Sequence, residues 1–150
     1  MLEYCTPAWS PHYVTDKAML ERAQRRFTRM VPGLRRLEYD ARLKELGLWT
    51  LEERRNRADL IETFKILNGL SGIVANTLFE ISVDSRTRGH SLKLSKNRCN
   101  SDLRKYFFSE RVINRWNKLK QQSVAAKTIN IFKSALKTER EAVQGFFIDD

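Results

Sequence analysis

The chain has 150 residues, of which 41% are hydrophobic and 31% charged, a balance typical of globular proteins and unlike that of a disordered tail. It holds only three prolines and six glycines, which excludes collagen-like and linker-dominated chains and leaves room for long helices. Its 28 lysines and arginines outnumber 18 aspartates and glutamates, and the net charge of +10 favours a phosphate backbone or another anionic surface as partner.

Cysteine usage and hydropathy bear on the compartment. Cys5 and Cys99 are the only cysteines, too few for a disulfide framework, so a reducing compartment is the default. The first 13 residues lack the basic stretch and apolar run of a signal peptide. The longest uncharged stretch, residues 66–79, is 14 residues long, whereas a membrane span needs about 20. We therefore expect a protein of the cytoplasm or nucleus with no membrane partner.

The first helix in chain order follows a lead-in in which Pro7 and Pro11 favour extended backbone at Thr6 and Ser10. It is expected to begin near residues 15–16, with Thr15 or Asp16 as N-cap, and to end at Pro32-Gly33. Apolar residues at helical spacing predict a stripe that faces the core: Leu20, Ala23, Phe27, Met30, Val31 and Leu34.

Two further helices are predicted before residue 70. Residues 39–46 form a short one, closed by Gly47 in the left-handed position that glycine favours. Thr50 and Glu53 have the spacing of a capping box, which begins the next helix. That helix ends at Gly69 and directs four residues inward: Leu60, Ile61, Phe64 and Leu67.

The second half begins with a mixed segment and continues with a polar, basic stretch over residues 84–100, where Leu92 and Leu94 alternate with polar residues and allow a short strand or an extended loop. A helix over 102–119 and a last one capped by Thr128 follow. The fold class predicted is mainly α: a small domain of about five helices with a basic, partly extended central connection that has room for one short hairpin or strand. We divide it into a helical subdomain at 1–70, a connection at 71–100 and a helical subdomain at 101–150.

Three blocks of sequence occur in a characteristic order. They are residues 2–12 (LEYCTPAWSPH) with 20–29 (LERAQRRFTR); residues 39–43 (YDARL), 46–48 (LGL), 51–55 (LEERR) and 59–61 (DLI); and residues 88–91 (RGHS), 107–112 (FFSERV), 116–117 (WN) and 132–133 (FK). Together they resemble the region downstream of the polymerase core in LINE-type, jockey-like non-LTR retrotransposon reverse transcriptases. Ala23 departs from that pattern, in which valine is usual.

The resemblance implies a thumb and post-thumb region whose early helices lie against the template–primer duplex. The palm carboxylates that hold two metal ions for polymerisation lie upstream in that family, so no catalytic residue, cofactor or small-molecule substrate is expected here. The implied partners are RNA, DNA or an RNA–DNA hybrid, together with the polymerase palm of the intact parent protein.

Other chemical motifs have plainer readings. Residues 147–150 (FIDD) fit the aromatic-x-Asp-Asp pattern of polymerases, but no second strand follows them, so we interpret them as a solvated acidic stretch. The two histidines and two cysteines lack the two-to-five-residue spacing of zinc ligand pairs, and no metal site is expected. Phosphate-binding loops and nucleophile elbows are also missing from the sequence.

Two basic sets are the predicted nucleic-acid contacts. Arg22, Arg25, Arg26 and Arg29 share one helix face over about 11 Å, and they repel one another unless an anion or a carboxylate such as that of Glu21 opposes them. The second set is the basic connection: Arg86, Arg88, His90, Lys93, Lys96 and Arg98. The plainer readings are a solvated charged face for the first set and a flexible basic linker for the second.

The function predicted is therefore a non-catalytic, nucleic-acid-binding tail of a non-LTR retrotransposon reverse transcriptase that holds template–primer or RNA through phosphate contacts. The alternative is a helical protein-interaction module, or a domesticated remnant without nucleic-acid binding. A sequence-specific DNA-binding regulator is a third reading, which lacks a helix exposing Asn, Gln, Ser and Arg together for base readout.

Overall fold

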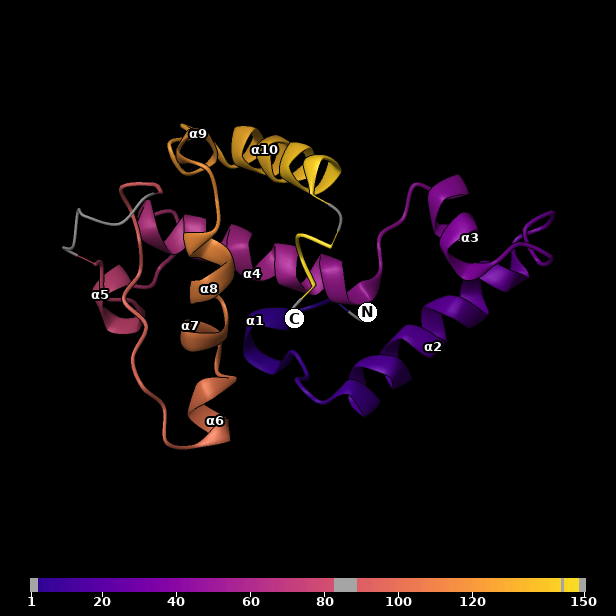
Figure 1. Cartoon of the computed structure of the whole chain (residues 1–150), viewed down its shortest axis with the longest axis horizontal. Coiled ribbons are helices and arrows are strands. Elements are labelled where there is room, and N and C mark those ends of the chain that lie inside the picture. The colour runs from indigo at the N-terminus through magenta and orange to yellow at the C-terminus, as the bar shows by residue number, and fades with distance from the viewer. Residues whose placement is uncertain (1–2, 83–88, 144, 149–150) are drawn as a thin grey trace.

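The computed structural model describes residues 3–82, 89–143 and 145–148. This part of the chain is mainly helical, as the sequence predicts (Figure 1). The longer helices are α2 (Val14–Met30), α3 (Tyr39–Glu45), α4 (Leu51–Leu67) and α10 (Ile129–Ala142). Shorter ones of four or five residues connect and flank them: α1 (Thr6–Trp9), α5 (Ala75–Leu78), α6 (Asp102–Lys105), α7 (Phe108–Arg111), α8 (Ile113–Asn117) and α9 (Gln121–Val124).

The helix boundaries follow the capping residues at three of the expected places. Thr50 and Glu53 form the reciprocal capping box of α4, and the Thr128 hydroxyl accepts a hydrogen bond from the Ile131 amide at the start of α10. Gly47 ends α3 with a φ of 62°, where a side chain would be strained. Local chemistry therefore sets these ends, and the predictions are confirmed.

The N-terminal segment differs from the prediction in two ways. Thr6 is helical, because Pro7 lies in the first turn of α1, where a missing amide hydrogen is tolerated. The N-cap of α2 is Tyr13, without a side-chain hydrogen bond, and neither Thr15 nor Asp16 caps it. The prediction that α2 ends before Pro32 is confirmed.

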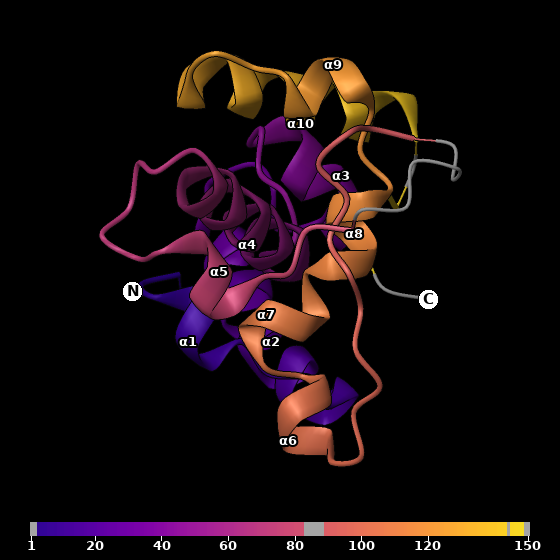
Figure 2. The ribbon, with the colours of Figure 1, turned by 90° about the vertical axis from the view of Figure 1, so that its left-hand side faces the viewer.

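The hydrophobic core surrounds α4, and Figure 2 shows α9 and α10 along one side of that helix with α7 and α8 along another. Leu60 and Phe64 of α4 share one buried cluster with Trp116 of α8 and Phe132 of α10. The rings of Phe64 and Phe132 stack with centroids 4.3 Å apart. The core therefore joins residues from both predicted subdomains, and the boundaries at 70 and 100 stay a prediction.

The helix predicted over 102–119 is divided into α6, α7 and α8. Phe108, Val112, Trp116 and Leu119 are buried, whereas Leu103 is 87% exposed. The break lies at residues 106–107, where the Tyr106 carbonyl accepts a hydrogen bond from the Arg111 guanidinium (3.3 Å). The Arg111 side chain bonds this carbonyl in place of a backbone amide, and the next helix, α7, begins at Phe108.

The segment around Leu94 is extended and forms an antiparallel bridge with Ile81. The Ser82 amide donates to the Lys93 carbonyl (2.8 Å), and the Ser95 amide donates to the Glu80 carbonyl (2.7 Å). Within residues 71–82 and 89–100, the described parts of this connection, the structure forms this single bridge and no longer strand. No helix within the described ranges is long and apolar enough to cross a membrane.

Candidate nucleic-acid interface

The six apolar residues of the stripe predicted for α2, the apolar row, do not form a buried face. The prediction that this row faces the core is therefore wrong. Phe27 is 62% exposed and Met30 is 74% exposed, Ala23 is exposed as well, and Leu20, Val31 and Leu34 are only half-buried. The buried positions of the helix are Gln24 and Thr28. The periodicity thus identifies a helix correctly but not the face that meets the rest of the protein.

Polar side chains attach α2 to α3 and to the start of α4. The Gln24 amide group donates to the Tyr39 hydroxyl (3.1 Å) and to the Trp49 carbonyl (2.9 Å). The Thr28 hydroxyl accepts from the Arg42 guanidinium (3.0 Å). Glu21 accepts from the Leu51 amide (2.9 Å) with one carboxylate oxygen and from the Tyr39 hydroxyl with the other. These bonds are directional, so they fix the rotation of α2 about its axis.

The four arginines of α2 lie on its exposed side, as the sequence predicts for that face. Since Glu21 is engaged by α3 and α4, it does not pair with Arg25, and within the described chain no carboxylate forms an ion pair with this row. We use the name arginine row for Arg22, Arg25, Arg26 and Arg29.

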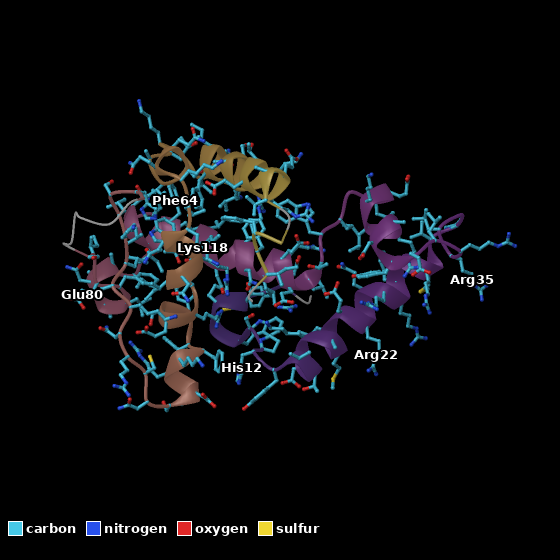
Figure 3. The ribbon with its side chains drawn as sticks, in the orientation of Figure 1. His12, Arg22, Arg35, Phe64, Glu80 and Lys118 are labelled. Atoms are coloured by element: carbon cyan, nitrogen blue, oxygen red, sulfur yellow. The ribbon has the colours of Figure 1, made fainter. Side chains whose placement is uncertain are left out.

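The arginine row borders a hollow of about 930 Å³, which the turn after α2 also lines. Arg35 comes from this turn, and Met30, Val31 and Pro32 add an apolar wall. Figure 3 shows Arg22 and Arg35 on the end of the molecule that α2 and α3 form. Arg35 lies beyond α2, so the helical spacing that identified the arginine row does not include it. Its positive charge was the only sign of a binding role in the sequence.

Tyr39 of α3 contacts the arginine row through its ring. The Arg25 guanidinium lies over the Tyr39 ring, 4.6 Å from its centroid. Burial, together with the hydrogen bond to Glu21, raises the pKa of the Tyr39 hydroxyl above its ordinary value. The hydroxyl donates to Glu21, a carboxylate that forms no ion pair with the arginine row among the described residues.

The second predicted set does not join the first. Arg86 and Arg88 lie outside the described residues. Lys96 and Arg98 are exposed. The extended segment before α6, to which they belong, lies at the opposite end of the long axis from α2 and α3 (Figure 1). The end of the Lys93 side chain lies against Gly89 and occupies the space that a polynucleotide backbone would need for a close approach to this glycine.

His90 is not a surface residue, and its prediction as a nucleic-acid contact is wrong. It is 3% exposed, and its Nε2 atom lies 2.9 Å from the Trp116 carbonyl oxygen. Its ring also contacts the Trp116 ring edge-on, at 5.9 Å between centroids. His90 therefore anchors the connection to α8.

The remaining polar constellations connect helices. Asp59, fully buried in α4, accepts two hydrogen bonds from Arg111 (2.8 and 3.0 Å). Glu53 accepts two from Arg140 (2.7 and 3.0 Å), and this pair ties α4 to α10. His12 stacks on Tyr106. Among the residues whose placement is described, no three His, Cys, Asp or Glu side chains gather into a metal-binding group.

The polymerase-like motif at residues 147–150 begins with a core residue. Phe147 is fully buried, and its ring stacks on Trp49 with centroids 5.6 Å apart. Its carbonyl oxygen accepts a hydrogen bond from the Asn56 side-chain amide. Asp149 and Asp150 lie outside the described residues.

Comparison of the chain with protein-family models, with curated proteins and with solved structures found no match. The site therefore has to be interpreted from its own geometry and charge.

Proposed function

We propose that this protein is a non-catalytic nucleic-acid-binding module that holds a polynucleotide through phosphate contacts on α2. The proposal depends on the arginine row, in which four exposed arginines lie along about 11 Å of helix. No carboxylate among the described residues pairs with them, and Arg35 lines the same hollow. Like charges at this spacing repel, and an anion relieves the repulsion. Arginine also binds phosphate oxygens in a bidentate manner.

The sequence resemblance to LINE-type reverse transcriptases supports the same role, since it implies a thumb-like region against template and primer. In this proposal the chemistry belongs to a separate polymerase palm, and the present chain contributes residence time on RNA, DNA or hybrid. Contacts of this kind position a polynucleotide without reading its sequence.

The test is a charge-matched pair of variants. In the first, the arginine row is changed to glutamine at all four positions. In the control, four exposed lysines elsewhere are changed to glutamine, so that net charge falls equally: Lys118, Lys120, Lys127 and Lys137. Binding of a labelled RNA–DNA hybrid is measured by fluorescence anisotropy between 50 and 300 mM salt.

For four to five neutralised phosphates, log K of the wild type should fall with log salt at a slope of about −3.5 to −4.5. The arginine-row variant should lose at least about tenfold in affinity and most of that slope, whereas the lysine control should keep both. Equal losses in the two variants would mean that net charge alone attracts the polynucleotide, and the proposed site would be wrong. A third variant, Lys96→Gln with Arg98→Gln, tests the predicted second set separately.

A protein-interaction module is the second candidate, because α2 also exposes large apolar side chains. Met19 is 64% exposed, and Phe27 and Met30 on the same helix are exposed as well. This candidate predicts a complex whose affinity hardly changes with salt and no hybrid binding at 100 mM salt. The salt series therefore separates the two functions.

A further inference from the structure

The hollow beside the arginine row combines two kinds of surface that a duplex does not use together. Arginines of α2 and Arg35 of the following turn line it, while Met30, Val31 and Pro32 supply an apolar wall. Met30 is 74% exposed although it lies in this concavity, so it is available to a ligand. A volume of about 930 Å³ is in the range of pockets that hold small organic groups.

The turn that closes the hollow is held in place from both ends. The Leu34 amide donates to the Val31 carbonyl (3.2 Å), and the Leu37 amide donates to the Leu34 carbonyl (3.1 Å). The Leu37 carbonyl in turn accepts a hydrogen bond from the buried Arg42 guanidinium of α3. The apolar wall therefore has a defined position relative to the arginine row before a ligand arrives.

A duplex presents its phosphates outward but keeps the faces of its bases stacked inside, so it would meet the guanidiniums and leave the apolar wall in water. An unpaired strand offers both phosphates and base faces, and proteins that bind such strands pair a basic groove with side chains on which the bases stack, most of them aromatic. In this hollow the apolar residues Met30, Val31 and Pro32 would take that place. Resting on the proposed function, we propose that the hollow takes unpaired nucleotides, with their phosphates on the arginine row and Arg35 and their bases on Met30, Val31 and Pro32.

The experiment compares two 12-nucleotide single strands of equal phosphate number, one normal and one abasic, in binding to the full chain at 100 mM salt. The wild type should bind the normal strand about fivefold or more tightly than the abasic one. Met30→Ser should reduce this preference while leaving the affinity for the abasic strand unchanged. Met19→Ser, on the same helix but outside the hollow, is the matched control and should keep the preference.

Equal affinity for normal and abasic strands, with both weakened by loss of the arginine row, would overturn this inference and leave the proposed function standing. Equal effects of Met30→Ser and Met19→Ser would also overturn it, because the hollow would then have no special part. If polyglutamate of the same charge competes as well as the normal strand, the bases are not recognised and the inference fails. Absence of binding to any polynucleotide, even at 20 mM salt, would instead refute the proposed function itself.

Discussion

The orientation of α2 can be tested through the stability of a Phe27→Ala variant. Phe27 belongs to the apolar row that the sequence pattern directs inward, but it is 62% exposed in the structure. Complete burial of a phenylalanine side chain stabilises a fold by about 1.5–3 kcal/mol, so the 38% that is buried here contributes about 0.6–1.1 kcal/mol. Alanine favours helix over phenylalanine by about 0.5 kcal/mol, which offsets part of the loss. The expected net change in unfolding free energy is below about 1 kcal/mol.

The matched variant is Phe132→Ala in α10, because Phe132 is fully buried and stacks on Phe64. Removal of a core phenylalanine costs about 3–5 kcal/mol. Urea unfolding followed by circular dichroism measures both variants, and at a slope near 2 kcal/mol per molar urea the Phe27 variant should shift the midpoint by less than about 0.5 M.

A loss of about 3 kcal/mol or more in Phe27→Ala would refute this reasoning. The apolar row would then face the core in solution, and the arginine row would have to lie elsewhere on the surface. Both proposals for α2 depend on the helix face described here, so this experiment comes first.

Three further predictions concern the buried charges of α4. Burial raises the pKa of the Glu53 carboxyl, but its hydrogen bonds with Arg140 and Thr50 have the larger combined effect and lower the pKa below the ordinary value of 4.5. This carboxylate therefore stabilises the fold above pH 4.5, and that contribution is lost as the pH falls through the native pKa. Glu53→Gln should therefore narrow the stability difference between pH 7 and pH 3 seen in urea titrations, and an unchanged difference would contradict the assignment. Arg111→Met leaves the buried Asp59 carboxylate without its bidentate partner and should lower the free energy of unfolding by about 3 kcal/mol in the same assay. A decrease under about 1 kcal/mol would contradict this expectation. Arg55→Met should leave stability unchanged or raise it, since burial lowers the pKa of Arg55 despite the nearby carboxylates of Glu52, Glu21, Glu3 and Asp59, and neither Nη1 nor Nη2 has a hydrogen-bond partner among the described residues. A loss above about 2 kcal/mol would show that attraction to those carboxylates outweighs the cost of burial.

Sequence patterns predict this fold best where the information is local. The capping box at Thr50 needs only the residues of one turn, and so does the hydroxyl of Thr128 at the start of α10. The inward positions of α4 and α10 were also predictable, because apolar residues there meet other apolar residues: Leu60, Phe64, Phe132 and Leu136 are all 1% exposed or less.

The face of α2 could not be predicted in this way, because it depends on partners farther along the chain. Glu21, Gln24 and Thr28 have helical spacing as good as that of the apolar row, and their value as an interface appears only once Tyr39 and Arg42 are placed opposite them. His90 shows the same limit, since a histidine beside basic residues gives no sign of the Trp116 carbonyl 26 positions away.

The polar attachment of α2 explains how an arginine row can be presented in a fixed direction without being buried. The apolar side chains of α2 are largely exposed, so hydrophobic burial contributes little to fixing the rotation of this helix. Gln24 instead uses both ends of its amide group, since it donates to Tyr39 and Trp49 and accepts from Arg54 (3.3 Å). Those three partners come from α3, from the segment before α4 and from α4 itself, so they set the rotation of α2 from separate directions. The outward aim of the arginines thus follows from hydrogen-bond geometry on the opposite side of the same helix, and the exposed apolar row is its consequence.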